Sequence, residues 1–204
     1  MKKKVELSEQ EQNELWLRFK TGDAEALGVL ARSHFRLLFN YGLQFTKDRE
    51  FIKDGIQDLF LELWSRREGL RESPFVTIYL LKALRNNLLR KLRQDKWLLE
   101  AESVESQDVS DWLTPESQTI QWEVSQENQD RLKAALAQLS PRQQEIIFLR
   151  FYEGLSAEEI TEVMKINPQS VYNLLHSALK QLKTSWIPES NLFFLALYQL
   201  LSAD

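Results

Sequence analysis

The feature that most constrains the fold of this chain is a series of helix start and stop signals between residues 139 and 182. Ser140 supplies an N-cap hydroxyl, and Pro141 follows at the first helical position, where its missing N–H costs nothing. Apolar residues continue the pattern until Gly154, which suits a helix end because glycine adopts left-handed backbone angles without penalty. The sequence therefore predicts a helix that begins at Ser140 and ends at Gly154.

Two further helices are predicted directly after this one. Ser156 and Glu159 have the spacing of a capping box, in which each side chain binds the backbone N–H of the other residue. A short turn over residues 165–167 ends that helix, and Pro168 opens a longer one. Two helices joined by a tight turn are the helix-turn-helix plan for placing one helix in a DNA major groove, although an ordinary helical hairpin has the same pattern.

The polar face of the last predicted helix favours the DNA-binding interpretation. At about 100° per residue, its polar side chains gather opposite Val171 and Leu175. Glutamine and asparagine can each form paired hydrogen bonds with an adenine edge. The alternative is a polar face that only contacts water. The candidate DNA-binding residues here are Gln169, Ser170, Tyr172, Asn173, His176 and Lys180.

Composition argues against several other classes of protein. The chain of 204 residues has no cysteine, which excludes disulfides, thiolate zinc sites and a cysteine nucleophile, and fits a reducing cytoplasm. Its two histidines lie in different units, and it has no glycine-rich phosphate loop. We therefore expect no enzyme activity, no cofactor and no metal site. We also expect no signal peptide and no membrane span, because no apolar run approaches about 20 residues.

The predicted fold class is all-α, with two helical domains joined by an acidic linker. The chain has only six glycines and five prolines, and no strand-like alternation persists. Before the linker, helical spacing predicts one helix over 8–21, a second that Asp23 caps, a third over about 50–64, and a long one over 75–99.

The predicted helix over 50–64 has an unusual outer face. Asp54, Gln57, Asp58 and Leu61 lie together on the side opposite its apolar stripe. An isolated exposed leucine is common in folded proteins and usually has no role. Among polar neighbours, it can also be the apolar anchor of a protein interface, so we treat both readings as open.

The helix over 75–99 carries the one concentrated basic patch of an otherwise acidic chain, whose net charge is −4. Aromatic residues flank and interleave its lysines and arginines, as expected for a surface that binds phosphates and stacks on unpaired bases. The alternative is an amphipathic helix whose basic face only contacts water. The basic residues are Lys82, Arg85, Arg90, Lys91, Arg93 and Lys96, and the aromatic ones are Phe75, Tyr79 and Trp97.

The composition divides the chain into four parts. Residues 1–99 form the first predicted domain and 120–187 the second. Between them, residues 100–119 read as a linker, because the stretch 100–118 has six acidic residues and no basic one. Residues 188–204 contain an apolar run too short to span a membrane, for which we expect a short helix packed on the rest of the chain. This helix would be either a structural cap on the second domain or a clasp that covers the polymerase- or DNA-binding faces.

Taken together, these segments resemble an extracytoplasmic-function (ECF) sigma factor, a small specificity subunit of bacterial RNA polymerase. The resemblance covers about residues 12–184 and depends on four motifs in the family's order. They are an opening motif at 19–27, a polymerase-binding helix at 54–64, a helix for the minus-ten promoter element at 79–93, and a domain for the minus-thirty-five element at 139–182.

The resemblance implies a role for each candidate site. Asp54, Gln57, Asp58 and Leu61 would dock on core polymerase. A loop over 66–73 would capture a flipped base. The residues implied at the minus-ten element are Arg66, Arg67, Arg71, Lys82, Arg85, Asn86, Arg90 and Arg93. The helix-turn-helix residues would read the minus-thirty-five element.

The implied partners are core RNA polymerase and promoter DNA, with an anti-sigma factor as a further candidate. The sequence departs from the family pattern in the last helix, where Tyr172, Leu174 and Ser177 stand in place of several basic residues. A stand-alone helix-turn-helix regulator and an all-helical interaction protein without a DNA role are the alternatives. The acidic linker argues against the first, and the basic helix argues against the second.

Overall fold

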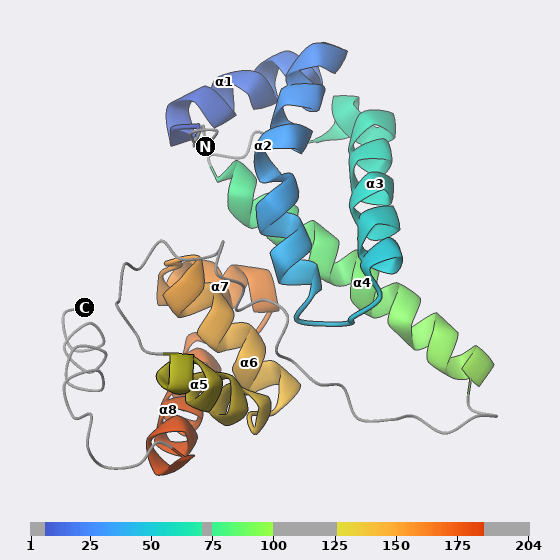
Figure 1. Ribbon diagram of the computed structural model, residues 1–204. Coiled ribbons are helices and arrows are strands. Elements are labelled where there is room, and N and C mark those ends of the chain that lie inside the picture. The colour runs from blue at the N-terminus through green and yellow to red at the C-terminus, as the bar shows by residue number, and fades with distance from the viewer. Residues whose placement is uncertain (1–6, 71–74, 100–125, 186–204) are drawn as a thin grey trace.

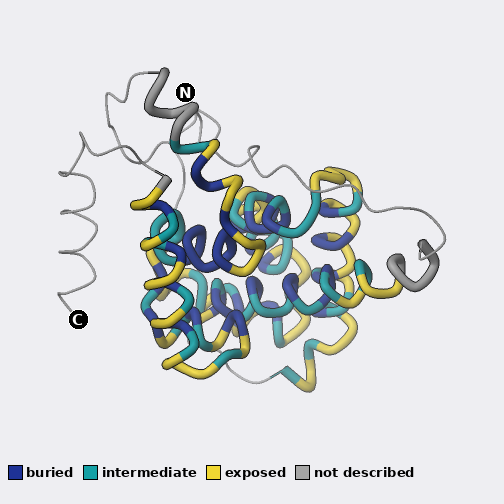
Figure 2. Tube along the Cα trace, turned by 90° about the horizontal axis from the view of Figure 1, so that it is seen from below, coloured by how far each residue is buried: buried dark blue, intermediate teal, exposed yellow. Residues whose placement is uncertain are grey.

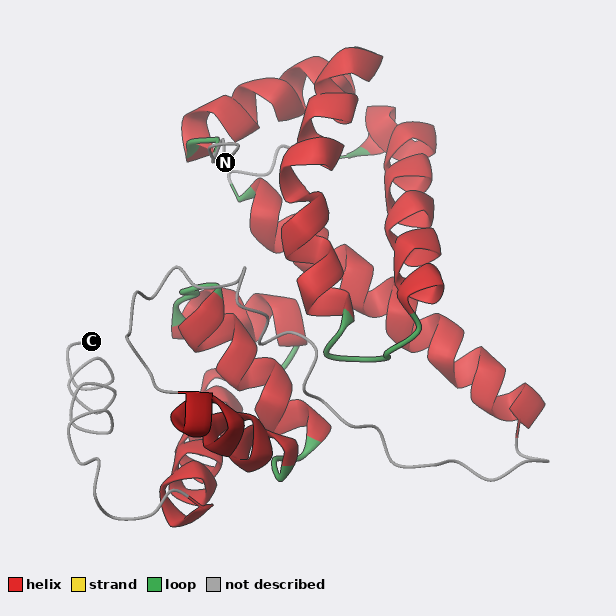
Figure 3. Ribbon diagram, viewed as in Figure 1, coloured by secondary structure: helices red, strands yellow, loops and turns green. Residues whose placement is uncertain are grey.

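The computed structural model of the chain describes residues 7–70, 75–99 and 126–185. Every regular element in these ranges is helical, as Figure 3 shows, and the predicted all-α class is confirmed. The predicted linker and the apolar tail lie outside the described residues, as does Arg71.

Two groups of helices follow one another along the chain, and α7 of the second group packs against α4 of the first (Figure 1). The first group, unit one, comprises α1 (Glu9–Lys20), α2 (Ala24–Gly42), α3 (Arg49–Arg66), the 3-10 turn η1 (Arg67–Gly69) and α4 (Val76–Leu99). The second group, unit two, comprises α5 (Gln126–Ala137), α6 (Pro141–Ile147), the π-helical turn η4 (Phe148–Tyr152), α7 (Ala157–Met164) and α8 (Pro168–Ser185).

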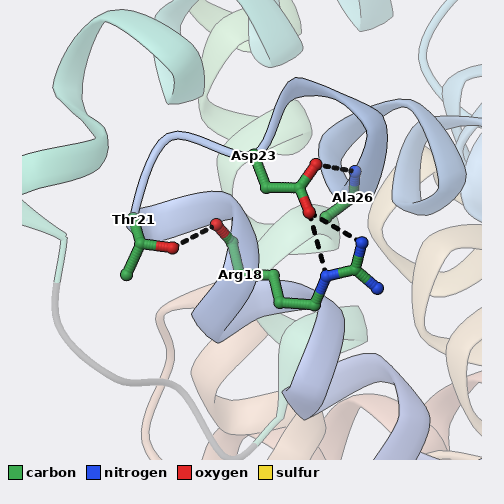
Figure 4. A network of polar contacts seen from close by, with 4 residues as sticks. All are labelled: Arg18, Thr21, Asp23 and Ala26. Carbon is green, nitrogen blue, oxygen red and sulfur yellow. Dashed lines mark hydrogen bonds and ion pairs between the residues drawn. The ribbon is translucent and has the colours of Figure 1, made fainter.

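The opening motif at 19–27 joins α1 to α2 through one carboxylate (Figure 4). Asp23 accepts a hydrogen bond from the Ala26 backbone N–H at 3.0 Å and so caps α2. The same carboxylate accepts two bonds from the Arg18 guanidinium, at 2.9 Å from Nε and 2.7 Å from Nη2. The hydrogen bond from the Ala26 N–H lowers the pKa of Asp23 the most, and the bond from Arg18 lowers it further. The motif therefore fixes the angle between two helices.

The predicted helix starts of unit two are confirmed. Ser140 and Ser156 are the N-caps of α6 and α7, and each forms a capping box, with Gln143 and Glu159 respectively. The predicted helix from Ser140 to Gly154 is interrupted, however. Its α-helical part ends at Ile147, and a π-helical turn follows before Gly154, whose φ is +71°. A π turn inserts a residue into the helix and rotates the side chains beyond it, which no propensity signal in the sequence revealed.

The buried apolar side chains of both units form one continuous core, and Figure 2 shows buried positions along the inward faces of the helices. In unit one, the fully buried side chains include Trp16, Phe19, Tyr41, Leu59 and Leu84. In unit two, they include Phe148, Leu149, Ile160, Val163 and Val171. The predicted apolar stripes therefore face inward.

Close packing between α3 and α4 depends on Gly55. A Cβ atom at this position would lie 2.6 Å from Cδ2 of Leu88, which is fully buried. Gly55→Ala should therefore destabilise the fold by about 1–2 kcal/mol, because overpacking outweighs the gain in helix propensity. Chemical denaturation measures the change.

Gly28 is the matched control within α2. The nearest atom to a Cβ there is Nη1 of Arg32 at 3.3 Å, the far end of a flexible side chain. Gly28→Ala should raise the free energy of unfolding by about 0.5–1 kcal/mol. Equal effects of the two substitutions would contradict this account of the α3–α4 contact.

A buried histidine ties together α2, α1 and α4. Nδ1 of His34 donates to the Leu30 carbonyl at 2.9 Å, and Nε2 lies 3.2 Å from the Thr77 hydroxyl and 3.3 Å from the Gln12 amide oxygen. Burial lowers the pKa of His34, partly offset by the Leu30 bond, so the fold favours the neutral ring.

The lowered pKa of His34 predicts a loss of stability in mild acid. The unfolded chain takes up a proton near pH 6.5 while the folded chain resists it, so the stabilisation is complete above that pH. It is lost as the pH falls through the unfolded value towards the folded one. Urea denaturation between about pH 7.5 and about pH 5.5 should show this decline. His34→Gln should flatten the profile, and an equally steep decline in that variant would contradict this account.

Candidate polymerase and nucleic-acid interfaces

The outer face of α3 presents the four residues that the sequence singled out. Asp54, Gln57, Asp58 and Leu61 are all exposed, and Leu61 keeps 59% of its surface accessible. Asp58 forms an ion pair with Lys91 of α4, at 2.5 Å between Oδ2 and Nζ. This face therefore consists of one apolar side chain, Leu61, surrounded by acidic and hydrogen-bonding ones. We name these four residues the α3 patch.

The end of α3 and the turn η1 form a shallow depression of about 480 Å³, lined by Ser65, Arg66, Glu68, Gly69 and Leu70. Nearby, the Arg67 guanidinium lies 4.7 Å from the centre of the Trp64 ring and donates to the Trp64 carbonyl at 2.9 Å. These contacts hold Arg67 over an aromatic face, and Arg66 forms a surface ion pair with Glu62.

The basic side chains of α4 lie in different environments. Arg90 and Arg93 are exposed, while Lys82 and Asn86 are partly buried. Of the aromatic residues predicted to stack on bases, Phe75 is exposed, but Tyr79 packs edge-on against Trp16, with ring centres 5.1 Å apart.

Arg85 differs from the other basic residues of α4, because only 8% of it is exposed. Its Nε donates to Oε1 of Glu145 at 2.7 Å, and Nη2 donates to Oε2 at 3.2 Å. Glu145 is 3% exposed and lies in α6, so this ion pair joins the two units. The structure does not place Arg85 on the exposed basic face that the sequence predicted.

Tyr41 of α2 completes this buried group. Its hydroxyl donates to Oε1 of Glu145 at 2.6 Å, and its ring stacks on Phe148 with centres 6.0 Å apart. Burial and then the Glu145 charge raise the pKa of Tyr41 well above its ordinary value. Burial opposes the charge on Arg85, but the bonds and charge of Glu145 more than compensate and raise the Arg85 pKa.

Sequence reasoning missed Glu145 as a functional candidate. The one signal was a carboxylate at the start of an apolar run, next to Ile146 and Ile147. Such a residue is almost never fully buried unless it is paired, so its position in the apolar stripe implied an unseen basic partner.

A basic groove of about 840 Å³ lies beside the ion pair, between α4 and the α6 and α7 ends of unit two. Cations from both units line it, together with two apolar side chains. The lining residues are Arg85, Asn86, Leu89, Arg90, Arg93, Gln94, Arg142, Met164 and Lys165.

The outer face of α8 agrees with the sequence prediction. Gln169, Asn173, His176 and Lys180 are exposed, and the Gln169 amide donates to Oδ1 of Asn173 at 3.0 Å. Tyr172 lies on the same helix with 52% of its surface exposed, and Ser170 is partly buried.

The turn before α8 is tight. Lys165 adopts left-handed backbone angles, with φ 53°, and Asn167 accepts the Ser170 backbone N–H at 2.7 Å. The opposite face of α8 buries Val171 and Leu175 against unit two. The helix is thus fixed by its apolar side and open to solvent along its polar side.

Residues 7–70, 75–99 and 126–185 meet the requirements of neither a membrane span nor a metal site. Within them, no helix is both long and apolar enough to cross a membrane. The same residues contain no group of three or more histidine, cysteine or acidic side chains arranged to hold a metal ion.

Two family models match the chain, one for each helical unit. Residues 30–98 match the model described as Sigma-70 region 2, and residues 129–182 match the one described as Sigma-70, region 4. The first match contains the α3 patch and the basic helix, and the second contains the helix-turn-helix.

Curated proteins named as RNA polymerase sigma factors are similar to this chain over most of their length. The ECF RNA polymerase sigma factor SigL of Mycobacterium tuberculosis is 26% identical over 164 residues, which span 79% of this chain and 89% of that protein. The RNA polymerase sigma factor YlaC of Bacillus subtilis is 24% identical over 159 residues, covering 78% and 91% of the two chains.

Solved structures share the fold at low sequence identity. CnrH, solved with the cytosolic domain of CnrY, superposes with a TM-score of 0.58 at 18% identity, covering 85% of this chain and 96% of that one. The sigma factor RpoE of Bartonella quintana, solved with the anti-sigma factor NepR, gives a TM-score of 0.54 at 17% identity, with coverage of 74% and 89%.

Proposed function

Because this chain belongs to the ECF sigma factors, which direct bacterial core RNA polymerase to promoters, we propose that its two units divide promoter recognition between them. Unit one, within residues 1–99, docks on core polymerase and handles the minus-ten element. Unit two, within residues 120–187, reads the minus-thirty-five element. The observation that carries this proposal is the pairing of an exposed apolar residue on α3 with a separate polar recognition face on α8.

The α3 patch is the proposed docking surface for core polymerase. Leu61 is the large apolar side chain of the patch, and Asp54, Gln57 and Asp58 supply hydrogen-bonding groups around it. A central apolar anchor within a polar rim is how protein interfaces gain affinity. The Asp58–Lys91 ion pair braces one side of the patch against α4.

Two substitutions in the α3 patch test the docking role. Leu61→Arg should weaken binding to core polymerase by about 2 kcal/mol or more, and Gln57→Ala should weaken it by a smaller amount. Both side chains are exposed, so circular dichroism and melting should remain as in the parent chain. Binding is measured by fluorescence anisotropy of labelled chain against purified core enzyme.

Leu17→Arg is the matched control, because Leu17 is a 47% exposed leucine on α1, outside the patch. It should leave core affinity unchanged. Equal losses at Leu17 and Leu61, or no loss at Leu61, would remove α3 from the docking surface.

The proposed minus-ten surface is the depression at the end of α3 together with the basic residues of α4. The depression contributes Arg66, and Arg67 lies beside it over the Trp64 ring. Arg90 and Arg93 supply exposed charge for the phosphate backbone, and Lys82 and Asn86 lie along the same helix. Basic charge beside a recess is what binding of an unpaired, flipped base requires. Arg85 and Arg71 complete the proposed set.

The proposed minus-thirty-five surface is the polar face of α8. Its N-terminal half carries Gln169 and Asn173, whose amides can read base edges, and Lys180 lies two turns further along. Ser170, Tyr172 and His176 complete the set. The hydrogen bond from Gln169 to Asn173 sets the orientation of both amides before DNA arrives.

Base and phosphate contacts give different mutational signatures. Asn173→Ala in the holoenzyme should relax sequence preference at one upstream position, worth about 1–3 kcal/mol of discrimination. Gln169→Ala should produce a related change, because the two amides are bonded. Lys180→Ala should instead weaken binding to all DNA sequences by the same factor and reduce the salt dependence of binding.

A randomised upstream element, selected by transcription with each holoenzyme, measures these preferences. A uniform loss in all three variants would mean that α8 is oriented differently in the groove.

The remaining alternative is a stand-alone regulator, which would bind promoter DNA without core polymerase. The proposal requires the chain to form a stable complex with bacterial core polymerase and to start transcription on a promoter library. A chain that binds duplex promoters tightly without core enzyme would support the alternative. The proposed place of action is the cytoplasm, where bacterial RNA polymerase meets DNA. An anti-sigma factor is a candidate partner because the similar sigma factor RpoE was solved with the anti-sigma factor NepR.

A further inference from the structure

The contact between the two units is centred on one buried carboxylate. Glu145 of α6 accepts Nε and Nη2 of Arg85 from α4 and the hydroxyl of Tyr41 from α2. Both of its oxygens are therefore used by groups from unit one. Because Glu145 is 3% exposed, no solvent replaces these partners while the units remain in contact.

From this geometry we infer that Glu145 is a latch that holds the two units together and keeps Arg85 away from DNA. The inference rests on the proposed role of α4 in minus-ten binding. A carboxylate bound in the fork of an arginine takes the position that a DNA phosphate would take, because both anions accept the same paired N–H donors. Arg85 cannot bind both at once.

Several other contacts surround the latch. Lys82 and Glu162 form an ion pair at 3.4 Å, but 60% of the Glu162 side chain is exposed. The Asn40 amide donates to the Tyr152 hydroxyl at 3.1 Å, and the Tyr41 ring stacks on Phe148. The exposed ion pair contributes little, while the packing of α7 on α4 and the Tyr41–Phe148 stack hold the units together around the carboxylate. The buried pair is the charged contact at this interface whose loss on one side would leave a buried charge without a partner.

The π turn is part of the same contact. Phe148 and Tyr152, at its two ends, are the residues that reach Tyr41 and Asn40 of α2. A π turn is rare in helices and recurs at functional sites. Here it directs two aromatic side chains from unit two towards α2, next to the carboxylate.

A buried ion pair suits a contact that must also open. Its attraction is largely cancelled by the cost of removing both charges from water, so separating the units and rehydrating both partners costs little. Removing only one partner is different, because the other remains buried without compensation. Glu145→Gln should therefore shift the chain towards the open arrangement, in which Arg85 is exposed.

The direct test is a distance measurement between the units. The chain has no cysteine, so spin labels can be attached to two introduced ones, at Glu50→Cys on α3 and Ala137→Cys on α5, both exposed. Double electron–electron resonance should give one short distance for the parent chain. Glu145→Gln should raise the ratio of long to short distances by at least about tenfold.

Glu162→Gln is the matched control. It removes one negative charge from the same side of the same contact, but from an exposed pair. It should change the distance ratio by less than about twofold. Tyr41→Phe removes one hydrogen bond to Glu145 without changing any charge and should give a smaller shift in the direction of Glu145→Gln.

DNA binding tests the second half of the inference. A mixed-sequence single-stranded DNA should bind the Glu145→Gln chain roughly threefold tighter or more, because hidden binding sites reduce the apparent affinity of the parent. The Glu162→Gln control separates this gain from a simple change in net charge. Adding Arg85→Ala to Glu145→Gln should abolish the gain, and DNA should lengthen the distances in the parent by the same coupling.

The outcomes are distinct. Unchanged distances in both Glu145→Gln and Tyr41→Phe would overturn the latch, whatever the DNA result. Longer distances without a gain in DNA affinity would overturn the sequestration of Arg85. If neither the parent chain nor any variant binds core polymerase, the proposed function is wrong. The distance measurement still decides whether Glu145 holds the units together.

Discussion

The arrangement of the two helical units depends on a buried negative charge that unit two places against unit one. Glu145 cannot be buried alone, since an isolated carboxylate in a protein interior is strongly unfavourable. Arg85 and Tyr41 together satisfy it, and each comes from a different helix of unit one. The carboxylate therefore joins α6 to α2 and α4, and α7 packs on α4 beside it. The basic groove lies where α4 meets the ends of α6 and α7.

The same constraint explains why the cations of α4 have separate roles. Three of them are matched to acids on three different elements, namely Arg85 to Glu145 on α6, Lys91 to Asp58 on α3 and Lys82 to Glu162 on α7. Only the first pair is buried, so it alone resists screening by salt. Arg90 and Arg93 line the groove, where Arg90 also donates to Oδ1 of Asn87 at 3.2 Å.

Much of the fold and of the candidate surfaces could be predicted from the sequence because local rules determine them. The capping boxes at Ser140 and Ser156 define helix starts through bonds within four residues, and the spacing around Leu61 shows its exposure directly. The predicted sigma-factor family was confirmed by the two family matches. The assignment of individual residues to polymerase or DNA stays a prediction.

What the sequence did not reveal depends on contacts between distant residues. Arg85 and Glu145 are 60 residues apart, and helical periodicity places Arg85 on α4 without saying what lies against it. The π turn after Ile147 has the same origin, since it brings Phe148 and Tyr152 towards α2 rather than satisfying a local preference. A charged residue in an apolar stripe therefore indicates a partner of opposite charge that lies far away in the sequence, because neither charge can be buried without the other. Arg85 has a proposed second ligand, a DNA phosphate, whereas the hydrogen bonds of the Glu145 side chain among the described residues all lie within this contact. Substituting Glu145 therefore removes the contact between the units and leaves the arginine that is proposed to bind DNA in place.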